Sequence, residues 1–409
     1  MTERINVIGL GYIGLPTALM LASKGLQVTG TDLDAKKVAQ LKNRTLTFEE
    51  TGLEGLYQEA LKNGIRFTDE YQKADVYIVA VPTPFHKASK KVVADYLISA
   101  VEKVVQVCDD NVIIVIESTV SPGTIDTFVR PIIDKTCEKH RKRIHLVHAP
   151  ERIIPGSMLQ ELIYNNRTIG ADEEEVAKKV CHIYSSFCKG EIDLTDIRTA
   201  EMSKVVENAY RDINIAYANE LVKICRAAGI NVYELIRIAN RHPRVNILTP
   251  GPGVGGHCIS VDPWFLVGDY PGLANIILAA RKINDSMPEY VLERIREIMD
   301  ENGIEAIERV GLYGLTYKEN VDDIRESPTL QLIANMRRHL ARGIKIYDPY
   351  IKEDIIENQY HDFKEFLKNI DFLVIMVGHD EIKERMDEIG DLLVLDTRNV
   401  MEREGVYRL

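Results

Sequence analysis

The sequence has little of what a membrane-spanning, secreted or nucleic-acid-binding protein requires. No apolar run approaches the roughly 20 residues needed to cross a bilayer, and the first residues show no charged, apolar and small signal pattern. A formal net charge of −11 argues against a general nucleic-acid binder. The 6 cysteines show no CxxC pair and no metal-like spacing, and such scattered thiols are typical of a reducing compartment. We therefore expect a cytoplasmic protein without a metal site.

A glycine motif near the start of the chain is typical of dinucleotide binding. Residues 5–8 form a short apolar run, which leads directly into GxGxxG at Gly9, Gly11 and Gly14 and then into a helical pattern. Residues 28–32 predict a second strand that ends in Asp32. The glycines would let a pyrophosphate lie on the helix N-terminus, and Asp32 could accept hydrogen bonds from ribose hydroxyls. The acid favours NAD over NADP, and a turn that binds nothing is the alternative.

Polar residues follow three further predicted strands. Thr83 follows residues 75–81, Thr119 follows residues 112–117, and Glu151 follows residues 144–148. Ligands of open α/β sheets gather at the carboxyl ends of the strands. Each residue alone could be a helix cap or turn residue. Together, beside a dinucleotide motif, they favour a shared cleft.

The pattern becomes helical after about residue 193 and returns to strands near residue 309. Residues 195–228 predict one long helix, on which Lys204, Asn208 and Arg211 form a stripe that could also be a solvated face. A second strand-and-loop series without GxGxxG begins at residue 309. Its loops carry cations that suit an anionic ligand, although each alone could be plain surface: Lys318, Arg325 and Arg398.

The chain is too long for one ordinary core, since it has 409 residues of which 45% are hydrophobic and 28% charged. We predict an α/β fold with two Rossmann-like doubly wound domains joined by a central helical domain with one long helix. The predicted boundaries are 1–194 for the NAD-binding domain, 195–302 for the central domain and 303–409 for the C-terminal domain.

A glycine-rich stretch, TPGPGVGGHCISVDPWF at residues 249–265, contains Cys258 and Asp262. If residues 260–265 are helical, these two residues lie near one face of the first turn, where N–H groups could stabilise a thiolate. A structural turn with an inert cysteine is the alternative. A nucleophilic cysteine suits an enzyme that attacks an aldehyde, because the thiohemiacetal can lose a second hydride and the thioester can then be hydrolysed.

The chain resembles the UDP-glucose/GDP-mannose dehydrogenases in a series of motifs that occur in order from residue 5 to about residue 398. The motifs are GLGYIGLP, VPTP, ESTVSPGT, Pro150-Glu151, Lys204 to Asn208, GPGVGGHC with Asp262, and Tyr317-Lys318 through RESP. The resemblance implies oxidation of a nucleotide sugar at C6, from alcohol to carboxylate, with reduction of two NAD molecules. It also implies a homodimer paired through the central helices, and neither nucleic acid nor membrane as a partner.

The resemblance assigns expected roles to individual residues. Cys258 would be the nucleophile and Lys204 the acid/base group, Asn208 and Asp262 would support the reacting oxygen and water, and Glu151 and Thr119 would position or activate water. The expected NAD contacts are Gly9, Gly11, Tyr12, Ile13, Gly14, Asp32, Lys37, Thr83, Thr119 and Arg325. The expected UDP-sugar contacts are Arg152, Ile153, Lys204, Asn208, Arg211, Gly255, Tyr317, Lys318 and Arg398, with His242 and Arg244 reaching the partner's site.

The stretch around Cys258 looks most like that of UDP-N-acetyl-D-mannosamine dehydrogenases. UDP-N-acetylglucosamine dehydrogenases share GGHC, so they and the UDP-glucose enzymes remain alternative readings. Lys37 departs from the arginine expected in the most similar enzymes, and it would keep the charge but lose bidentate geometry. A single-step hydroxyacid dehydrogenase and a nucleotide-sugar-binding protein without turnover are the other hypotheses.

Overall fold

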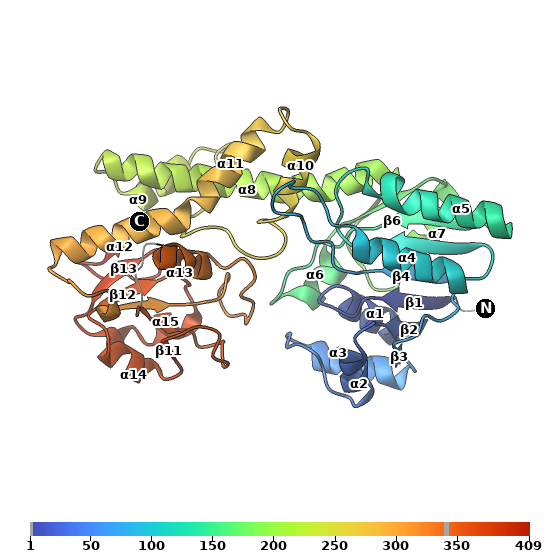
Figure 1. Cartoon of the computed structure of the whole chain (residues 1–409), viewed down its shortest axis with the longest axis horizontal. Coiled ribbons are helices and arrows are strands. Elements are labelled where there is room, and N and C mark those ends of the chain that lie inside the picture. The colour runs from blue at the N-terminus through green and yellow to red at the C-terminus, as the bar shows by residue number, and fades with distance from the viewer. Residues whose placement is uncertain (1–2, 339–342) are drawn as a thin grey trace. The chain divides into compact units, whose positions relative to one another are not determined.

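A computed structural model describes residues 3–338 and 343–409 of the chain. The chain divides into two compact units, an N-terminal unit (Met1–Glu207) and a C-terminal unit (Asn208–Leu409). Figure 1 shows a sheet with covering helices in each unit. The predicted α/β class with two Rossmann-like sheets and a helical central part is confirmed. The three-domain boundaries stay a prediction.

The N-terminal unit contains an eight-stranded sheet in the order β3-β2-β1-β4-β5-β6-β7-β8. Neighbouring strands pair in parallel except for β6 and β7, which are antiparallel. The strands are β1 (Arg4–Ile8), β2 (Gln27–Thr31), β3 (Arg66–Thr68), β4 (Val76–Val79), β5 (Val112–Ile116), β6 (Ile144–His148), β7 (Arg167–Ala171) and β8 (Ile192–Thr195).

Helices pack on both faces of this sheet, because its central strands are apolar on both sides. One core contains residues of α1 (Gly14–Ser23), α2 (Ala35–Lys42), α3 (Leu53–Lys62), α6 (Met158–Tyr164) and α7 (Glu174–Tyr184). The other contains residues of α4 (Asp95–Val107), the π-helix η1 (Ile125–Val129) and α5 (Arg130–His140). The sheet reverses its strand order between β1 and β4, which is where doubly wound sheets bind ligands.

The C-terminal unit contains a six-stranded parallel sheet in the order β11-β10-β9-β12-β13-β14. Its strands are β9 (Val310–Tyr313), β10 (Lys345–Tyr347), β11 (Gln359–Tyr360), β12 (Phe372–Ile375), β13 (Leu393–Asp396) and β14 (Tyr407–Arg408). The helices beside it are α13 (Pro328–Arg338), α14 (Phe363–Lys368) and α15 (Asp380–Glu384), with short 3-10 turns η2 (Ile307–Arg309) and η3 (Met386–Ile389).

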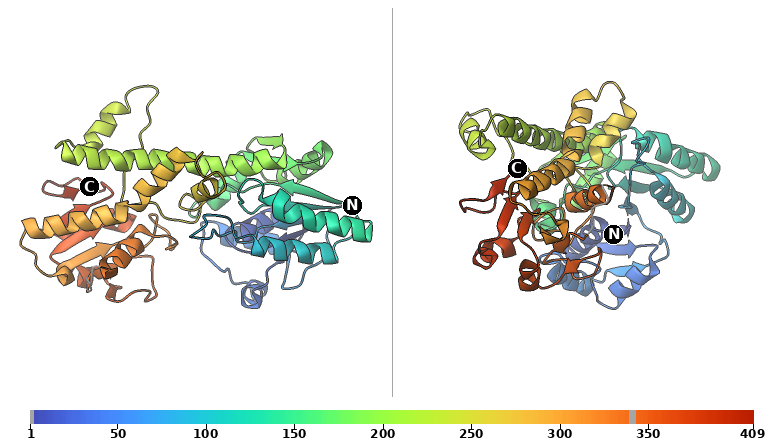
Figure 2. Two further views of the ribbon diagram at one scale, coloured as in Figure 1. Left: turned by 45° about the horizontal axis from the view of Figure 1, so that its top comes forward. Right: turned by 60° about the vertical axis from the view of Figure 1, so that its left-hand side comes forward.

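The long helix predicted over residues 195–228 is α8 (Ile197–Ala227), and it crosses from one unit into the other. The helices that follow it are α9 (Val232–Ala239), α10 (Asp262–Asp269), α11 (Asn275–Asp285) and α12 (Met287–Glu301). Figure 2 shows α8 as one continuous helix from two further directions. The pattern from residue 275 towards residue 302 predicts a single helix. This prediction is wrong, because α11 ends at Asp285 and Pro288 lies in the first turn of a new helix, α12.

No helix in the described part of the chain is both long and apolar enough to cross a membrane. Residues 3–338 and 343–409 contain no group of three or more His, Cys, Asp or Glu side chains that could hold a metal ion.

Candidate active site

The glycine motif after β1 forms a tight turn at the point where the strand order reverses. Gly9 has φ +89°, and a Cβ there would lie 2.6 Å from the Ala80 carbonyl oxygen of the neighbouring chain segment. A Cβ on Gly14 would lie 1.9 Å from the Gly9 carbonyl oxygen, so α1 can start this close to the turn only with glycine. Gly11 has open space beside it. Gly9 and Gly14 therefore allow the close packing of the turn, and Gly11 leaves space beside the backbone. This arrangement fits the pyrophosphate of NAD at the start of α1.

The Asp32 carboxylate at the end of β2 is held by the same turn. It accepts hydrogen bonds from the Leu10 N–H at 2.8 Å and the Asp34 N–H at 2.9 Å, and from Lys37 Nζ at 2.9 Å. Burial opposes ionisation, but these donors outweigh it and lower the pKa of Asp32. The acid is thus ionised and oriented, as an acceptor for ribose hydroxyls should be. At the position where an arginine was expected, Lys37 forms an ion pair with Asp32.

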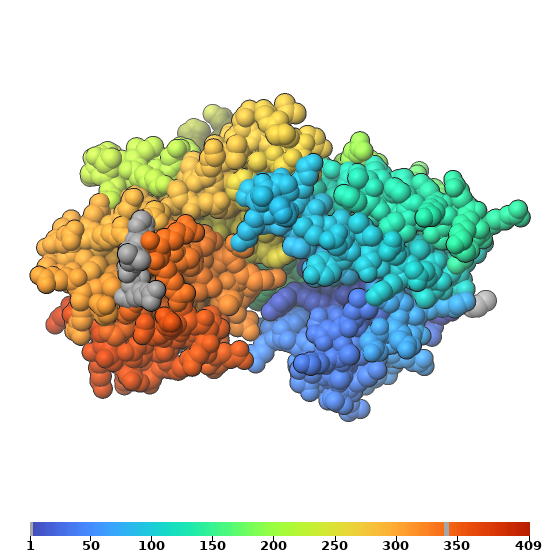
Figure 3. All heavy atoms as spheres, viewed as in Figure 1, coloured from blue at the N-terminus to red at the C-terminus, as the bar shows by residue number. Residues whose placement is uncertain are grey.

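The two threonines predicted at strand ends meet directly. Thr83 Oγ1 donates to the Thr119 carbonyl oxygen at 2.5 Å, and Thr83 is buried. This hydrogen bond joins the loop after β4 to the loop after β5. The loop after β4 lies on the surface of the N-terminal unit (Figure 3). Nearby, Tyr12 packs on Phe48 with 4.5 Å between ring centroids, and Ile13 is the residue before α1.

Glu151 is buried in an ion pair that could not be predicted from the sequence. Its Oε2 accepts from Arg167 Nη2 at 2.5 Å, and its Oε1 accepts from the Arg152 N–H at 2.7 Å. Arg167 also lies 4.0 Å from the Glu117 carboxylate and over the Tyr184 ring. Burial, followed by the charge of Glu151, raises the pKa of Glu117. The arginine thus ties two buried acids together.

The side chain of Arg152, which is an expected substrate contact, forms hydrogen bonds with residues of the N-terminal unit. Its guanidinium donates to the Glu207 carboxylate at 2.7 Å, to the Asn166 carbonyl oxygen at 2.7 Å and to Thr168 Oγ1 at 2.9 Å. Its neighbour Ile153 is buried.

Lys204 on α8 is only 6% exposed. Within the described N-terminal unit its amino group forms no hydrogen bond or ion pair, although a buried polar group normally requires a partner. A ligand oxygen would satisfy it. Asn208 lies one turn further along the same helix face.

The cysteine loop, residues 249–265 of the C-terminal unit, makes close backbone contacts at its glycines. A Cβ on Gly255 would lie 2.5 Å from the Tyr317 Cβ, and one on Gly256, whose φ is +83°, would lie 2.9 Å from the Tyr317 ring. The Gly256 N–H donates to the Arg325 carbonyl oxygen at 2.9 Å, and the Gly251 N–H donates to Asn219 Oδ1 at 2.9 Å. The loop that carries Cys258 therefore rests on the loop that carries Tyr317.

Cys258 precedes α10, which begins at Asp262, two residues later than expected because Pro263 suits the first turn. The Asp262 N–H donates to the Cys258 carbonyl oxygen at 2.8 Å. The Asp262 carboxylate accepts from Asn208 Nδ2 at 2.6 Å, and both residues are buried. The structure thus brings together three of the predicted catalytic residues, Cys258, Asp262 and Asn208.

Tyr317 lies close to several of the predicted charged residues. Burial raises the pKa of Tyr317 to about 12, with further contributions from Asp323 and Cys258, while Arg325 and Arg211 act in the opposite direction. Arg325 donates to the Asp323 carboxylate at 2.6 Å. Burial and the charge of Arg325 lower the pKa of His257, next to the cysteine.

The remaining predicted substrate residues of the C-terminal unit are Arg398, Lys318, His242 and Arg244. Arg398 Nη1 would be 2.6 Å from a Cβ on Gly251, so its guanidinium borders the cysteine loop. Lys318 follows Tyr317 in the same loop. His242 and Arg244 are exposed in the segment after α9, and their predicted role in a partner's site stays a prediction.

Sequence reasoning missed residues that hold loops of the candidate site in place through hydrogen bonds. Glu201 of α8 accepts from the Gly123 N–H at 2.6 Å and the Ile125 N–H at 2.9 Å. Asp348 and His379 hold the loop that carries Tyr317. The only sequence signal for Asp348 and His379 is their position, since each lies in the segment that follows a strand, β10 or β12.

The chain matches three domains of one family along most of its length. The matches are the UDP-glucose/GDP-mannose dehydrogenase family, NAD binding domain over residues 3–188, the central domain over residues 198–286 and the UDP binding domain over residues 311–403. The chain belongs to the UDP-glucose/GDP-mannose dehydrogenase family and is an NAD-dependent UDP-sugar dehydrogenase.

Individual relatives are similar over nearly their whole length. A UDP-N-acetyl-D-mannosamine dehydrogenase from Methanocaldococcus jannaschii is 42% identical, over 98% of this chain and 93% of the relative. The structure of a UDP-N-acetyl-D-mannosamine dehydrogenase from Pyrococcus horikoshii matches with a TM-score of 0.91 and 35% identity, over 99% of this chain and 98% of that one. An NDP-N-acetyl-D-galactosaminuronic acid dehydrogenase from Ralstonia nicotianae is 38% identical, over 98% and 97% of the two chains. The predicted resemblance is confirmed.

Proposed function

We propose that the protein oxidises UDP-N-acetyl-D-mannosamine at C6 to UDP-N-acetyl-D-mannosaminuronate in two NAD-dependent steps, with Cys258 as the nucleophile. The observation that carries this proposal is the cysteine loop, in which Cys258, Asp262 and Asn208 are held beside Tyr317 by glycine contacts and a short hydrogen bond. The choice of sugar is supported by relatives named as UDP-N-acetyl-D-mannosamine dehydrogenases at about 40% identity.

The reaction can be divided among the residues of this chain. NAD, when bound, supplies the hydride acceptor for each oxidation. Lys204, as the neutral amine, takes the C6 hydroxyl proton, and the ammonium group formed in this step stabilises the oxygen that becomes negative. The Cys258 thiolate adds to the aldehyde carbon to form a thiohemiacetal, which the second oxidation converts into a thioester. Asp262 and Asn208 orient the reacting oxygen and water, and hydrolysis returns the thiol and releases the carboxylate.

Glu151 has a narrower role in this scheme than the sequence suggested. Both oxygens of the Glu151 carboxylate are engaged, one by Arg167 and one by the Arg152 N–H, so we assign Glu151 the positioning of water or of the Thr119 loop rather than the removal of a proton. The remaining predicted contacts to NAD and to the UDP-sugar belong to the same proposal.

We also propose a homodimer formed through α8. Its exposed apolar side chains Tyr210, Tyr217 and Ile224 are spaced by seven residues and share one face of the helix. Such a stripe on a long helix suits a second copy of the same helix.

The proposed reaction is tested by the amount of NADH formed per sugar. Purified protein given limiting UDP-N-acetyl-D-mannosamine should form about two NADH per sugar, because an alcohol loses two hydrides on the way to a carboxylate. UDP-glucose, UDP-galactose and UDP-N-acetylglucosamine should be oxidised more slowly. If the protein oxidised one of them faster, that sugar would be assigned as the substrate instead. Cys258→Ser should form no acid. One NADH per substrate, with activity that survives this substitution, would instead favour a single-step hydroxyacid dehydrogenase, and no NADH with any sugar a binding protein.

A further inference from the structure

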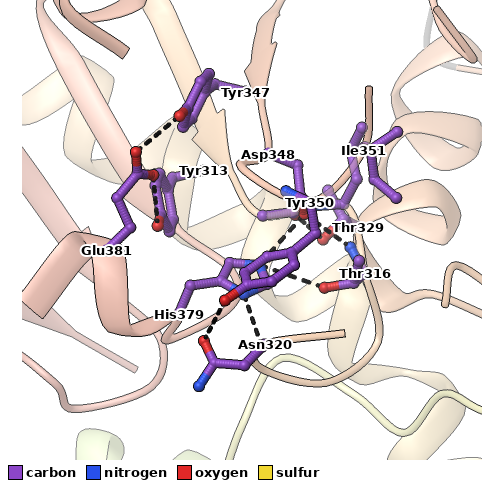
Figure 4. A network of polar contacts seen from close by, with 12 residues as sticks. Tyr313, Thr316, Asn320, Thr329, Tyr347, Asp348, Tyr350, Ile351, His379 and Glu381 are labelled. Carbon is purple, nitrogen blue, oxygen red and sulfur yellow. Dashed lines mark hydrogen bonds and ion pairs between the residues drawn. The ribbon is translucent and has the colours of Figure 1, made fainter. Parts of the chain in front are cut away.

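A buried histidine and aspartate stand on either side of the loop that carries Tyr317 and Lys318. This loop follows β9, and in the sheet β9 lies between β10 and β12. Asp348 directly follows β10 and His379 lies just beyond β12, and both side chains are inaccessible to solvent. The two residues therefore approach the loop from the ends of its neighbouring strands, as Figure 4 shows.

The two residues hold opposite ends of the loop. Asp348 Oδ2 accepts from the N–H groups of Leu315 at 2.6 Å and Thr316 at 3.1 Å, where the loop begins. Where it ends, the Asn320 N–H donates to His379 Nδ1 at 2.9 Å. Asn320 has φ +59°, a left-handed conformation that asparagine tolerates better than most residues. The loop thus has a fixed path at both ends.

The hydrogen bonds define the tautomer of His379. A backbone N–H can only donate, so Nδ1 must accept and the proton of the neutral ring lies on Nε2. Nε2 is 3.3 Å from Asp348 Oδ2 and 3.3 Å from Thr316 Oγ1. Thr316 Oγ1 in turn donates to the Lys318 carbonyl oxygen at 2.8 Å, in the middle of the loop. One connected network therefore reaches the start, middle and end of the loop.

The centre of the network, formed by Thr316, Asp348 and His379, is closed off from solvent. The rings of Tyr350 and Tyr313 lie 5.0 Å and 5.8 Å from the His379 ring (Figure 4). Burial opposes ionisation of Asp348, but His379 and the N–H donors outweigh it and lower the pKa of this carboxyl. A buried network in which each member is satisfied is rigid, which suits a support for a binding loop.

We propose that His379, together with Asp348, is a positioning residue for the uridine diphosphate part of the substrate. It acts by fixing the loop of residues 314–320, so that Tyr317 and Lys318 are held ready for the ligand. The same loop supports Gly255 and Gly256, so the network also fixes the backbone that leads to Cys258. The proposal rests on the proposed function for the identity of the ligand.

The test is the affinity of the full-length protein for UDP, measured by calorimetry, beside its affinity for NAD. His379→Ala removes the three polar contacts of the two ring nitrogens and should weaken UDP binding about fivefold or more, while NAD binding is unchanged. His379→Asn places an amide oxygen near the position of Nδ1, can still accept from Asn320, and should recover most of the affinity. The matched control is His361→Asn, because His361 lies exposed in the same unit and pairs only with Asp354 among the described residues.

A second variant reaches the same loop without the histidine. Thr316→Val keeps the volume of the side chain but removes the hydrogen bond to the Lys318 carbonyl oxygen. It should weaken the binding of UDP and leave the binding of NAD unchanged, and it can be measured even if the His379→Ala protein does not fold. The proposal would be overturned if a folded His379→Ala protein bound UDP as tightly as the wild type. If that variant does not fold, the same result for Thr316→Val would overturn it. Equal losses of affinity for UDP and for NAD would also contradict it. A wild-type protein that binds no UDP would refute the UDP-sugar function itself and this proposal with it.

Discussion

Single glycines in the cysteine loop determine how closely Cys258 can approach its surroundings. A methyl group added at Gly255 would meet the Tyr317 Cβ at 2.5 Å and the Glu326 carbonyl oxygen at 2.7 Å, and backbone cannot yield as a flexible side chain can. We expect Gly255→Ala to lower kcat at least about tenfold and the unfolding free energy by about 1–3 kcal/mol. Steady-state kinetics and thermal denaturation would measure the two effects.

The control for this substitution is a glycine with room around it. Gly55 lies exposed within α3, and a Cβ there would meet nothing within 4 Å. Gly55→Ala should leave kcat unchanged and stabilise the protein by about 0.5–1 kcal/mol, because alanine favours the helix. Equal kinetic behaviour of the two variants would contradict the role given to Gly255.

At the scale of residues, the sequence predicted which loops carry chemistry but not which partners they meet. Cys258 and Asp262 stood out because glycines, a cysteine and an acid occur within one short stretch. The pairing of Arg167 with Glu151 could not be predicted, since it joins a strand residue to a loop through the fold. The contact of Gly255 with Tyr317 likewise spans 62 positions, 317 minus 255, and only the packed structure reveals it.

At the scale of elements, Glu201 connects helix α8 to the loop that carries Thr119. Its carboxylate accepts two backbone N–H groups at the start of η1, and it lies one turn before Lys204. Burial raises the pKa of Glu201 from 4.5 to about 7, although the two N–H donors oppose this. A raised pKa means that folding favours the protonated form. This contribution to stability is complete below about pH 4.5 and is lost as the pH rises through 7.

Glu201→Gln cannot titrate, so the comparison with the wild type isolates this carboxyl. The stability of the wild type relative to Glu201→Gln should fall by about 2 kcal/mol between roughly pH 5 and pH 8. Urea unfolding at several pH values would measure it. A constant difference between the two proteins across this range would show that Glu201 does not titrate in the folded state as expected.

The elements themselves were predictable where hydrophobic patterning is strong. The buried strand β5 and the long helix α8 lie close to their predicted bounds. Strands such as β8 and β11 were not predicted, because they are short edge strands without fully buried residues and lack the apolar run that marks a central strand. The break at Ser286 was missed because the apolar pattern continues through it, and only Pro288 indicates a new start.

At the scale of the whole molecule, α8 contains residues that belong to two separate proposals, the catalytic site and the dimer. It carries Lys204 and Asn208, and elsewhere along its length it exposes Tyr210, Tyr217 and Ile224 at 69%, 52% and 56%. Exposed apolar residues scattered singly are normal, but three at heptad spacing on one helix face favour pairing with another helix. The proposed dimer would therefore form along the same helix that carries two of the proposed catalytic residues.

The dimer is tested by placing a charge within this stripe. Tyr217→Glu should convert the proposed dimer to a monomer in sedimentation experiments, because a carboxylate in an apolar contact costs about 2 kcal/mol or more and weakens association at least tenfold. Activity should fall in parallel if His242 and Arg244 reach the partner's site. Tyr96→Glu is the control, since Tyr96 on α4 is 57% exposed but lies outside the stripe, and it should leave both assembly and activity intact. A Tyr217→Glu protein that still dimerises would exclude the stripe as the interface, and a wild type that sediments as a monomer would exclude the dimer.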